Sequence, residues 1–246
     1  MQLRRVLNQI KTPLISGISI VVIVCWLYLW QITADIPSIM KDPQMGITLW
    51  SAVDFWQMLV MWMVMMVGMM LPSAVPMLLI YERACAPDDR IATLLFMLGY
   101  LSIWLLFSLA ATLLQWGLDQ AALLSPMMVS SSPTLGAGIL IAAGLYQLSP
   151  LKHRCLSFCR TPLQFLTTHL RTGRSGALRM GLEHGFFCLG CCWALMGLLF
   201  VGGVMNLLWI AIIALFVLME KVLPYGVQGG RYIGSLMVLV GLYLLF

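Results

Sequence analysis

The segment FWQMLVMWMVMMVGMMLPSAVPMLLI, residues 55–80, carries no charged side chain and consists mainly of methionine and aliphatic residues. A helix needs about 20 consecutive apolar residues to cross the hydrocarbon core of a bilayer. The segment therefore predicts a membrane-spanning helix. The whole chain shares this composition, because 61% of its 246 residues are hydrophobic and only 9% are charged. A soluble domain is charged at about a quarter of its positions.

Similar apolar runs lie on both sides of this segment. Together they predict one all-α membrane domain, a polytopic helical bundle of about seven spans, at residues 13–33, 55–80, 91–115, 134–151, 185–204, 205–219 and 233–246. The last two runs are short, so six spans remain an alternative. A tight turn at Gly202 and Gly203 is expected to join the fifth and sixth spans into a hairpin. The first run is longer than the apolar core of a signal peptide, so we expect an uncleaved span.

The basic residues predict the orientation of the chain. With seven spans and a cytoplasmic N-terminus, thirteen of the fourteen Lys and Arg residues fall on the cytoplasmic side, and Lys41 alone falls on the other. This asymmetry follows the positive-inside rule, and it predicts a multi-pass protein in the lipid bilayer of the cell inner membrane. The net charge of +5 is spread over short loops. Nucleic-acid binding would need it gathered on one polar face, so nucleic acid is excluded as a partner.

The predicted second span is rich in methionine, with seven methionines within residues 58–70. A stripe about 80° wide on the helix contains Met58, Met61, Met65 and Met69, with Asp54 one turn before it and Pro72 and Pro76 after it. Thioethers are soft, uncharged ligands that suit Cu(I), so the stripe predicts a relay for a soft cation. Methionine also fills irregular apolar cores, and that alternative stays open.

The two prolines predict a kink or a short unwound stretch in this span, because proline removes a backbone donor and clashes with the preceding turn. Breaks of this kind occur at the binding sites of transporters. A simple packing kink is the alternative.

A second group of ligands lies in RMGLEHGFFCLGCCWALM, residues 179–196. On a helix, one face carries Met180, His184, Cys188 and Cys191, and Cys192 lies just beside it. Imidazole and thiolate are standard ligands of Cu(I) and Zn(II), so this face predicts a metal site, with Cu(I) favoured over Zn(II). Glu183 is a candidate to orient the imidazole. Free cysteine also packs as a small apolar residue, which is the alternative.

A third group, Cys155 and Cys159 in PLKHRCLSFCR (residues 150–160), opens what we expect to be the longest cytoplasmic loop. The topology places this pair on the same side as the start of the fifth span, where it could load or release the metal. Disulfides are not expected there, because the cytoplasm keeps thiols reduced. Glu220 and Lys221, adjacent at the end of the sixth span, are expected to form an interfacial ion pair.

Four segments, WQMLVMWMVMMVGMMLPSAVPMLLIY, PLKHRCLSFCR, GLEHGFFCLGCCWALM and MEKVLP, resemble an uncharacterised prokaryotic family described as predicted metal-binding integral membrane proteins. The resemblance extends from about Asp54 to Lys221. It implies a bacterial inner-membrane protein that handles a metal, and it specifies neither the metal nor an activity.

These patterns favour a membrane protein that binds a soft metal, with Cu(I) preferred, and that transports the ion or delivers it to a partner metalloprotein. Two alternatives remain: a membrane thiol-disulfide oxidoreductase that uses the cysteines, and a structural or assembly subunit with a fixed metal. The chain contains no P-loop, GxSxG or HExxH motif, so no enzyme class is indicated.

Overall fold

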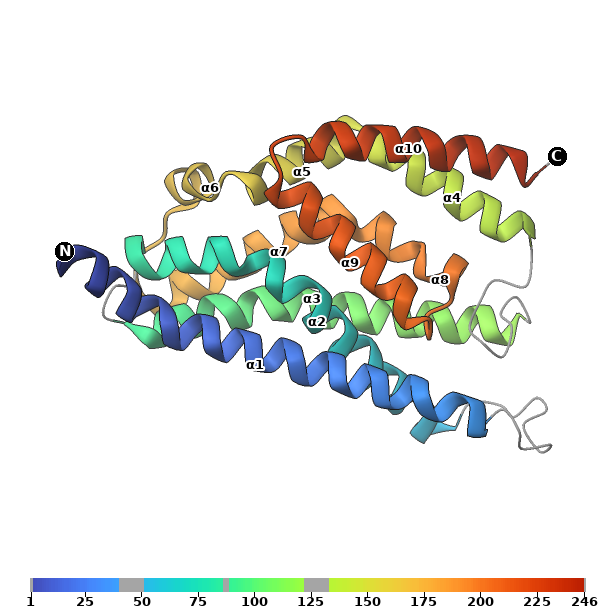
Figure 1. Cartoon of the computed structure of the whole chain (residues 1–246), viewed down its shortest axis with the longest axis horizontal. Helices are drawn as coiled ribbons and strands as arrows, with labels where there is room; N and C mark the ends of the chain where they lie inside the picture. Colours follow the sequence, from blue (N-terminus) through green and yellow to red (C-terminus); the bar gives the residue numbers. More distant parts are fainter. Residues whose placement is uncertain (1, 40–50, 86–88, 122–132, 246) are drawn as a thin grey trace.

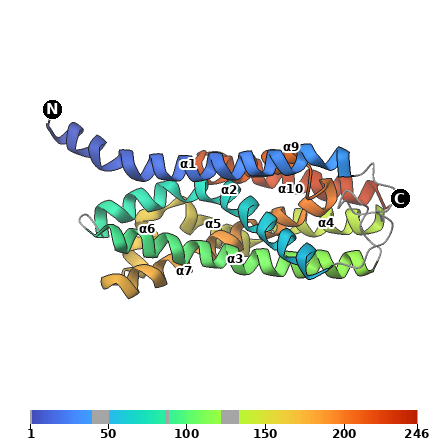
Figure 2. The ribbon, with the colours of Figure 1, turned by 90° about the horizontal axis from the view of Figure 1, so that it is seen from below.

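A computed structural model describes residues 2–39, 51–85, 89–121 and 133–245, and Lys41 lies outside these ranges. The described elements are all helices: α1 (Gln2–Ile39), α2 (Ala52–Cys85), α3 (Arg90–Gln120), α4 (Pro133–Leu148), α5 (Pro150–Arg160), α6 (Pro162–His169), α7 (Gly173–Gly197), α8 (Leu199–Gly202), α9 (Leu207–Val222) and α10 (Gly226–Tyr243). The long helices run roughly along one axis and form an elongated bundle (Figures 1 and 2). The all-α prediction is therefore confirmed for the described part of the chain.

Within the described ranges, four helical stretches are long and apolar enough to cross a membrane: Pro13–Ala34, Ala52–Cys85, Arg90–Gln120 and Gly173–Gly202. A fifth is available if α4 and α5, which meet at a bend of 63°, are counted as one span. Helices α9 and α10 have 16 and 18 residues, so they are about 24 and 27 Å long, against a hydrocarbon core of about 30 Å. The count of seven spans and the cytoplasmic N-terminus stay predictions.

Helix α2 remains helical through Pro72 and Pro76, and its ribbon changes direction along its length (Figure 1). The backbone near the prolines receives hydrogen bonds from side chains. The hydroxyl groups of Ser73 and of Tyr100 on α3 both donate to the carbonyl oxygen of Met70, at 2.8 and 3.1 Å. The bond from Tyr100 ties the segment to α3 two residues before Pro72. The segment therefore bends without unwinding.

Glycines let α3 and α7 pack backbone against backbone. A methyl group at Gly99 would overlap the carbonyl oxygen of Leu178, and one at Gly181 would overlap that of Phe96. Close approach through small residues is the usual way in which helices associate inside a membrane. This contact places the His- and Cys-bearing face of α7 in the interior, next to α2 and α3.

The hairpin predicted at Gly202 and Gly203 is present. Gly203 has a φ of 95°, a left-handed conformation that glycine adopts without steric cost, and the side chain of Asn206 accepts a hydrogen bond from the Trp209 amide to cap α9. The connection from α9 to α10 lies partway along the bundle and not at its end (Figure 1). The end of α9 thus brings charged residues into the interior.

The segment expected as the longest cytoplasmic loop is helical instead. It forms α5 and α6, and Lys152, Leu156, Phe165 and Leu166 are buried. Helix α7 begins at Gly173, earlier than the span predicted from Gly185. The basic residues gave the segment a polar composition, but its apolar residues recur at helical spacing and pack inward. Lys152, expected in that loop, and Lys221, expected at the membrane interface, are both buried.

Candidate metal centre

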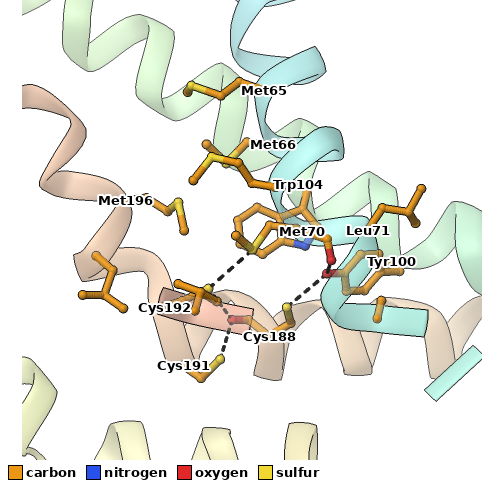
Figure 3. Packing of buried hydrophobic residues seen from close by; sticks show 14 of the residues in the cluster. Met65, Met66, Met70, Leu71, Tyr100, Trp104, Cys188, Cys191, Cys192 and Met196 are labelled. Carbon is orange, nitrogen blue, oxygen red and sulfur yellow. Dashed lines mark hydrogen bonds between the residues drawn. The ribbon is translucent and has the colours of Figure 1, made fainter. Parts of the chain in front are cut away.

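Three thiols from α7 lie in the core of the bundle. Cys188, Cys191 and Cys192 are each only 1% exposed. The Sγ atoms of Cys191 and Cys192 both donate to the carbonyl oxygen of Cys188 at 3.0 Å (Figure 3). These bonds to the helix's own backbone hold the two sulfurs close to α7. The three cysteines therefore form one sulfur-rich patch on the inner face of the helix.

Helix α5 adds a fourth thiol to this patch. The Sγ atom of Cys159 lies 3.9 Å from that of Cys191. A metal–sulfur bond is about 2.3 Å long, so two sulfurs at this separation can both bind one ion placed between them. Cys155, one turn earlier on α5, has its Sγ atom against the backbone of Gly190. It therefore lies beside α7, next to the cluster formed by Cys159, Cys188, Cys191 and Cys192.

A methionine from α2 reaches the same cluster. The Sδ atom of Met70 lies 3.9 Å from the Sγ atom of Cys192. Figure 3 shows Met65 and Met66 of α2 and Met196 of α7 continuing away from this contact. All of these thioethers are fully buried, and we refer to Met65, Met66, Met70 and Met196 as the methionine column.

The predicted stripe only partly overlaps this column. Met61, Met65 and Met69 are buried, whereas Met58 is half-buried and its Sδ atom accepts a weak hydrogen bond from Gln115 at 3.7 Å. The methionine that touches a thiol is Met70, about 100° around the helix from Met69. The helical repeat identifies the face of α2 that carries the most methionines. It does not show which face of α2 is turned toward α7. The relay through Met58, Met61, Met65 and Met69 stays a prediction.

His184 is 3% exposed, and its Nδ1 atom has no hydrogen-bond partner among the described residues. Its ring packs between aromatic rings, with centroid distances of 5.2 Å to Phe165, 5.8 Å to Tyr100 and 6.0 Å to Phe96. A buried nitrogen without a partner costs about 1–3 kcal/mol. Such a cost is explained if a ligand binds the imidazole, which is the chemistry expected of a metal-binding histidine.

A buried lysine completes the centre. The ammonium group of Lys221 donates to the Sγ atom of Cys188 at 2.9 Å and to the hydroxyl group of Ser73 at 3.0 Å. The hydroxyl group of Tyr100 lies on another side of the same sulfur, at 3.2 Å. The ammonium group of Lys221 therefore supplies the polar hydrogen that stabilises negative charge on the Cys188 sulfur.

The expected interfacial pair of Glu220 with Lys221 does not form. Glu220 pairs instead with Lys152 at 2.7 Å and accepts a hydrogen bond from Gln147 at 2.8 Å. Lys152 also donates to the carbonyl oxygen of Cys191 at 2.9 Å. The side chains of adjacent residues on a helix point in directions about 100° apart and do not face each other. Glu220 and Lys221 therefore enter different parts of the interior and contact different partners.

Two further candidates near the start of α7 lie outside the cluster. Glu183 forms an ion pair with Arg171 at 2.8 Å, and the structure does not bring it to the imidazole of His184 as a hydrogen-bond partner. The Sδ atom of Met180 accepts a hydrogen bond from the backbone amide of Arg171 at 3.4 Å. Both side chains therefore stabilise the turn that leads into α7.

The remaining candidates lie on α2, away from the thiols. Asp54 is exposed, and its carboxylate accepts hydrogen bonds from the backbone and side chain of Ser51, at 2.8 and 2.7 Å. Pro72 lines a groove against α1, and Pro76 is exposed. None of the three contributes a donor atom to the centre.

Across the part of the chain that the structure describes, no three His, Cys, Asp or Glu side chains are arranged to hold a metal ion as they stand. Cys191 and Cys192 point toward a backbone carbonyl, so their side chains must rotate before they bind an ion. Soft thiolate and thioether ligands select Cu(I), and a Cu(I) ion accepts as few as two of them. The donor set therefore fits Cu(I) after the side chains of Cys191 and Cys192 rotate, and the Sγ atom of Cys191 already lies within 3.9 Å of that of Cys159.

A family model described as PpoB2, a copper chaperone, matches residues 59–244. The matched region includes every residue of the centre described above, from Met70 to Lys221. The comparisons with curated proteins and with solved structures found no match.

Proposed function

Because the chain belongs to the PpoB2 copper chaperone family, we propose that it is a multi-pass protein of the cell inner membrane that binds Cu(I) inside the helical bundle and passes it to a partner metalloprotein. The function of the family is copper-related. The membrane location, the direction of movement and the ligands belong to the proposal. It treats Cu(I) as a cargo that is bound and released.

The observation that carries this proposal is the pair of sulfurs from two different helices, Cys159 on α5 and Cys191 on α7, with Sγ atoms 3.9 Å apart. Two thiolates on opposite sides of an ion form the simplest site for Cu(I), and the site closes or opens as the helices move. Cys188, beside Lys221, is the third donor. A ligand set divided between two elements suits reversible binding, because a small displacement of one helix removes a ligand.

The other soft donors form routes by which the ion enters and leaves the thiol cluster. The thioether column of Met65, Met66, Met70 and Met196 meets the cluster at Cys192 (Figure 3), and uncharged ligands of this type carry a cation through an apolar interior without ionising. Cys155 lies one turn from Cys159 and is the candidate for loading or release on the α5 side. His184 supplies an imidazole at the edge of the cluster.

A second candidate function is thiol–disulfide exchange. The separation of Cys159 and Cys191 favours it, because a modest approach of the two sulfurs would allow them to form a disulfide. It leaves the methionine column and the unpartnered His184 without a role. An oxidoreductase should need no metal and should cycle between dithiol and disulfide, whereas a structural subunit should hold its metal without exchange.

The test is copper retention by the detergent-purified, reduced protein after loading with Cu(I). The wild-type protein is compared with Cys159→Ser, Cys191→Ser and a control, Cys85→Ser, which changes a half-buried thiol at the end of α2. We expect near-stoichiometric copper in the wild type and the control, and loss of most of it in the other two variants. Retention in a Cys159→Ser/Cys191→Ser double variant would overturn the proposal, and a reversible disulfide without metal binding would favour the oxidoreductase.

A further inference from the structure

The methionine column meets aromatic rings on the side away from the thiols. On α2, Trp62 lies four residues before Met66, one turn along the same face of the helix. Helices α7 and α8 form one helical stretch, on which Phe200 lies four residues beyond Met196. The rings of Trp62 and Phe200 pack against each other, with centroids 5.6 Å apart. Aromatic side chains from both helices therefore lie where the column would continue.

Trp62 is fixed in this position by α3. It is fully buried, and its ring packs edge-on against that of Phe107, with centroids 6.5 Å apart. Its indole N–H group donates a hydrogen bond to the Oε1 atom of Gln115 at 2.6 Å. A buried indole usually finds such a partner, and here the bond holds the ring in one orientation.

Gln115 also binds a thioether on the far side of the rings. Its Nε2 atom donates to the Sδ atom of Met58 at 3.7 Å, and Met58 is half-buried. The buried Met61 lies one turn from Met58 and one turn from Met65, so thioethers continue past the rings to this point. Figure 1 shows the start of α2 and the end of α3 toward one end of the bundle and α6 toward the other.

We propose that Trp62 and Gln115 form a gate that closes the far end of the methionine column, and that Met58 is the thioether at which Cu(I) enters or leaves the bundle there. This inference rests on the proposed Cu(I)-binding function. The half-buried thiols of Cys155 and Cys159 lie on α5, on the other side of the thiol cluster. An opening at Met58 therefore lets the ion pass through the protein without returning to α5.

One side chain controls both parts of the gate. The amide nitrogen of Gln115 holds the sulfur of Met58, and the amide oxygen of the same residue holds the ring of Trp62. Rotation of Gln115 therefore releases the thioether and the ring in a single step. A thioether is a weak hydrogen-bond acceptor and a good ligand for a soft cation, so an arriving Cu(I) ion competes well with the amide for the sulfur.

The experiment measures the rate at which Cu(I) enters lipid vesicles that contain the full chain. Cu(I) is added outside with ascorbate, and a membrane-impermeant Cu(I) chelator inside the vesicles reports its arrival, after subtraction of the rate in vesicles without protein. Gln115→Leu removes both hydrogen bonds at similar volume, and we expect it to raise the rate about fivefold or more. Trp62→Phe, which loses the indole N–H group, should also raise the rate.

Replacement of Met58 should change the rate in the opposite direction. Met58→Leu keeps an apolar side chain and removes the thioether, so it should slow the entry of Cu(I), and the double variant Met58→Leu/Gln115→Leu should lose the acceleration. Trp116→Phe is the control at the wild-type rate, because Trp116 follows Gln115 on α3 but is 44% exposed. All variants should bind as much Cu(I) in detergent as the wild type, since the thiol cluster is unchanged.

An unchanged rate in Gln115→Leu, or an acceleration that persists in the double variant, would overturn the gate and leave the proposed function standing. If Gln115→Leu does not fold, wild-type rates in both Trp62→Phe and Met58→Leu would overturn the inference in the same way. A wild-type protein that binds no Cu(I) in detergent would overturn both proposals.

Discussion

The ammonium group of Lys152 lies 2.7 Å from a carboxylate oxygen of Glu220, and both side chains are almost completely shielded from solvent. The pair joins α5 to α9. Because Lys152 also donates to the carbonyl oxygen of Cys191, the pair helps to hold the α5 thiols against α7. The geometry of the centre therefore depends on an ion pair that provides no metal ligand.

Replacing one partner of this ion pair should destabilise the protein more than replacing both partners. Lys152→Met leaves Glu220 buried without its counter-charge, and we expect a loss of about 3–5 kcal/mol of stability. The double variant Lys152→Met/Glu220→Met should recover most of that loss. Thermal or denaturant unfolding in detergent measures both. Equal stability of the single and double variants would show that the pair is not coupled.

The backbone contact between α3 and α7 should tolerate no side chain. Gly181→Ala places a methyl group on the carbonyl oxygen of Phe96, so we expect a loss of about 1–3 kcal/mol. Gly117→Ala on α3 is the matched control, because nothing lies within 4 Å of the added methyl group. Alanine is the better helix former, so the control should be neutral or stabilising by up to about 1 kcal/mol. Equal unfolding temperatures for the two variants would contradict the close packing.

The unpartnered imidazole should contribute to metal binding and not to folding. His184→Leu removes a buried nitrogen that has no hydrogen bond in the described structure, so the metal-free protein should unfold at the wild-type temperature or above it. The same variant should retain Cu(I) less well under chelator competition. His169→Leu is the control, since His169 is a half-buried histidine that packs against Phe165 away from the thiols. A destabilised His184→Leu with normal copper retention would assign the residue to packing.

The contact between Met70 and Cys192 should affect the movement of copper more than the stability of the fold. Met70→Leu keeps the volume and apolar character of the side chain, so its stability should fall by less than about 1.5 kcal/mol. We expect slower transfer of Cu(I) to a chelator, because the thioether next to Cys192 is lost. Met77→Leu changes an equally buried methionine on the same helix and should transfer copper at the wild-type rate. Identical rates for both variants would remove Met70 from the route.

The sequence predicted the long apolar helices well. The spans expected at residues 13–33, 55–80 and 91–115 fall within α1, α2 and α3, because an uninterrupted apolar run has few ways to satisfy its backbone other than a helix. The face shared by His184, Cys188 and Cys191 was also predictable, since it depends only on the helical repeat.

Features that depend on contacts between helices were not predictable. The helical form of α5 and α6 follows from packing against α7, and the basic residues of that segment concealed it. Periodicity places Met70 on α2 but cannot show that it faces Cys192. Lys221 was assigned to Glu220 because the two are adjacent in sequence, whereas a helix turns adjacent side chains toward different neighbours.

The division of the thiols between α5 and α7 makes copper a cross-link. An ion held by Cys159 and Cys191 would close a loop between segments 32 residues apart in the chain, in the manner of a removable disulfide. Binding that occurs only in the closed arrangement stabilises that arrangement by a free energy that grows with the logarithm of the free ion concentration. The loaded and empty protein should therefore differ in the mobility of α5 and α6, and a partner able to sense that difference could recognise which molecules carry copper.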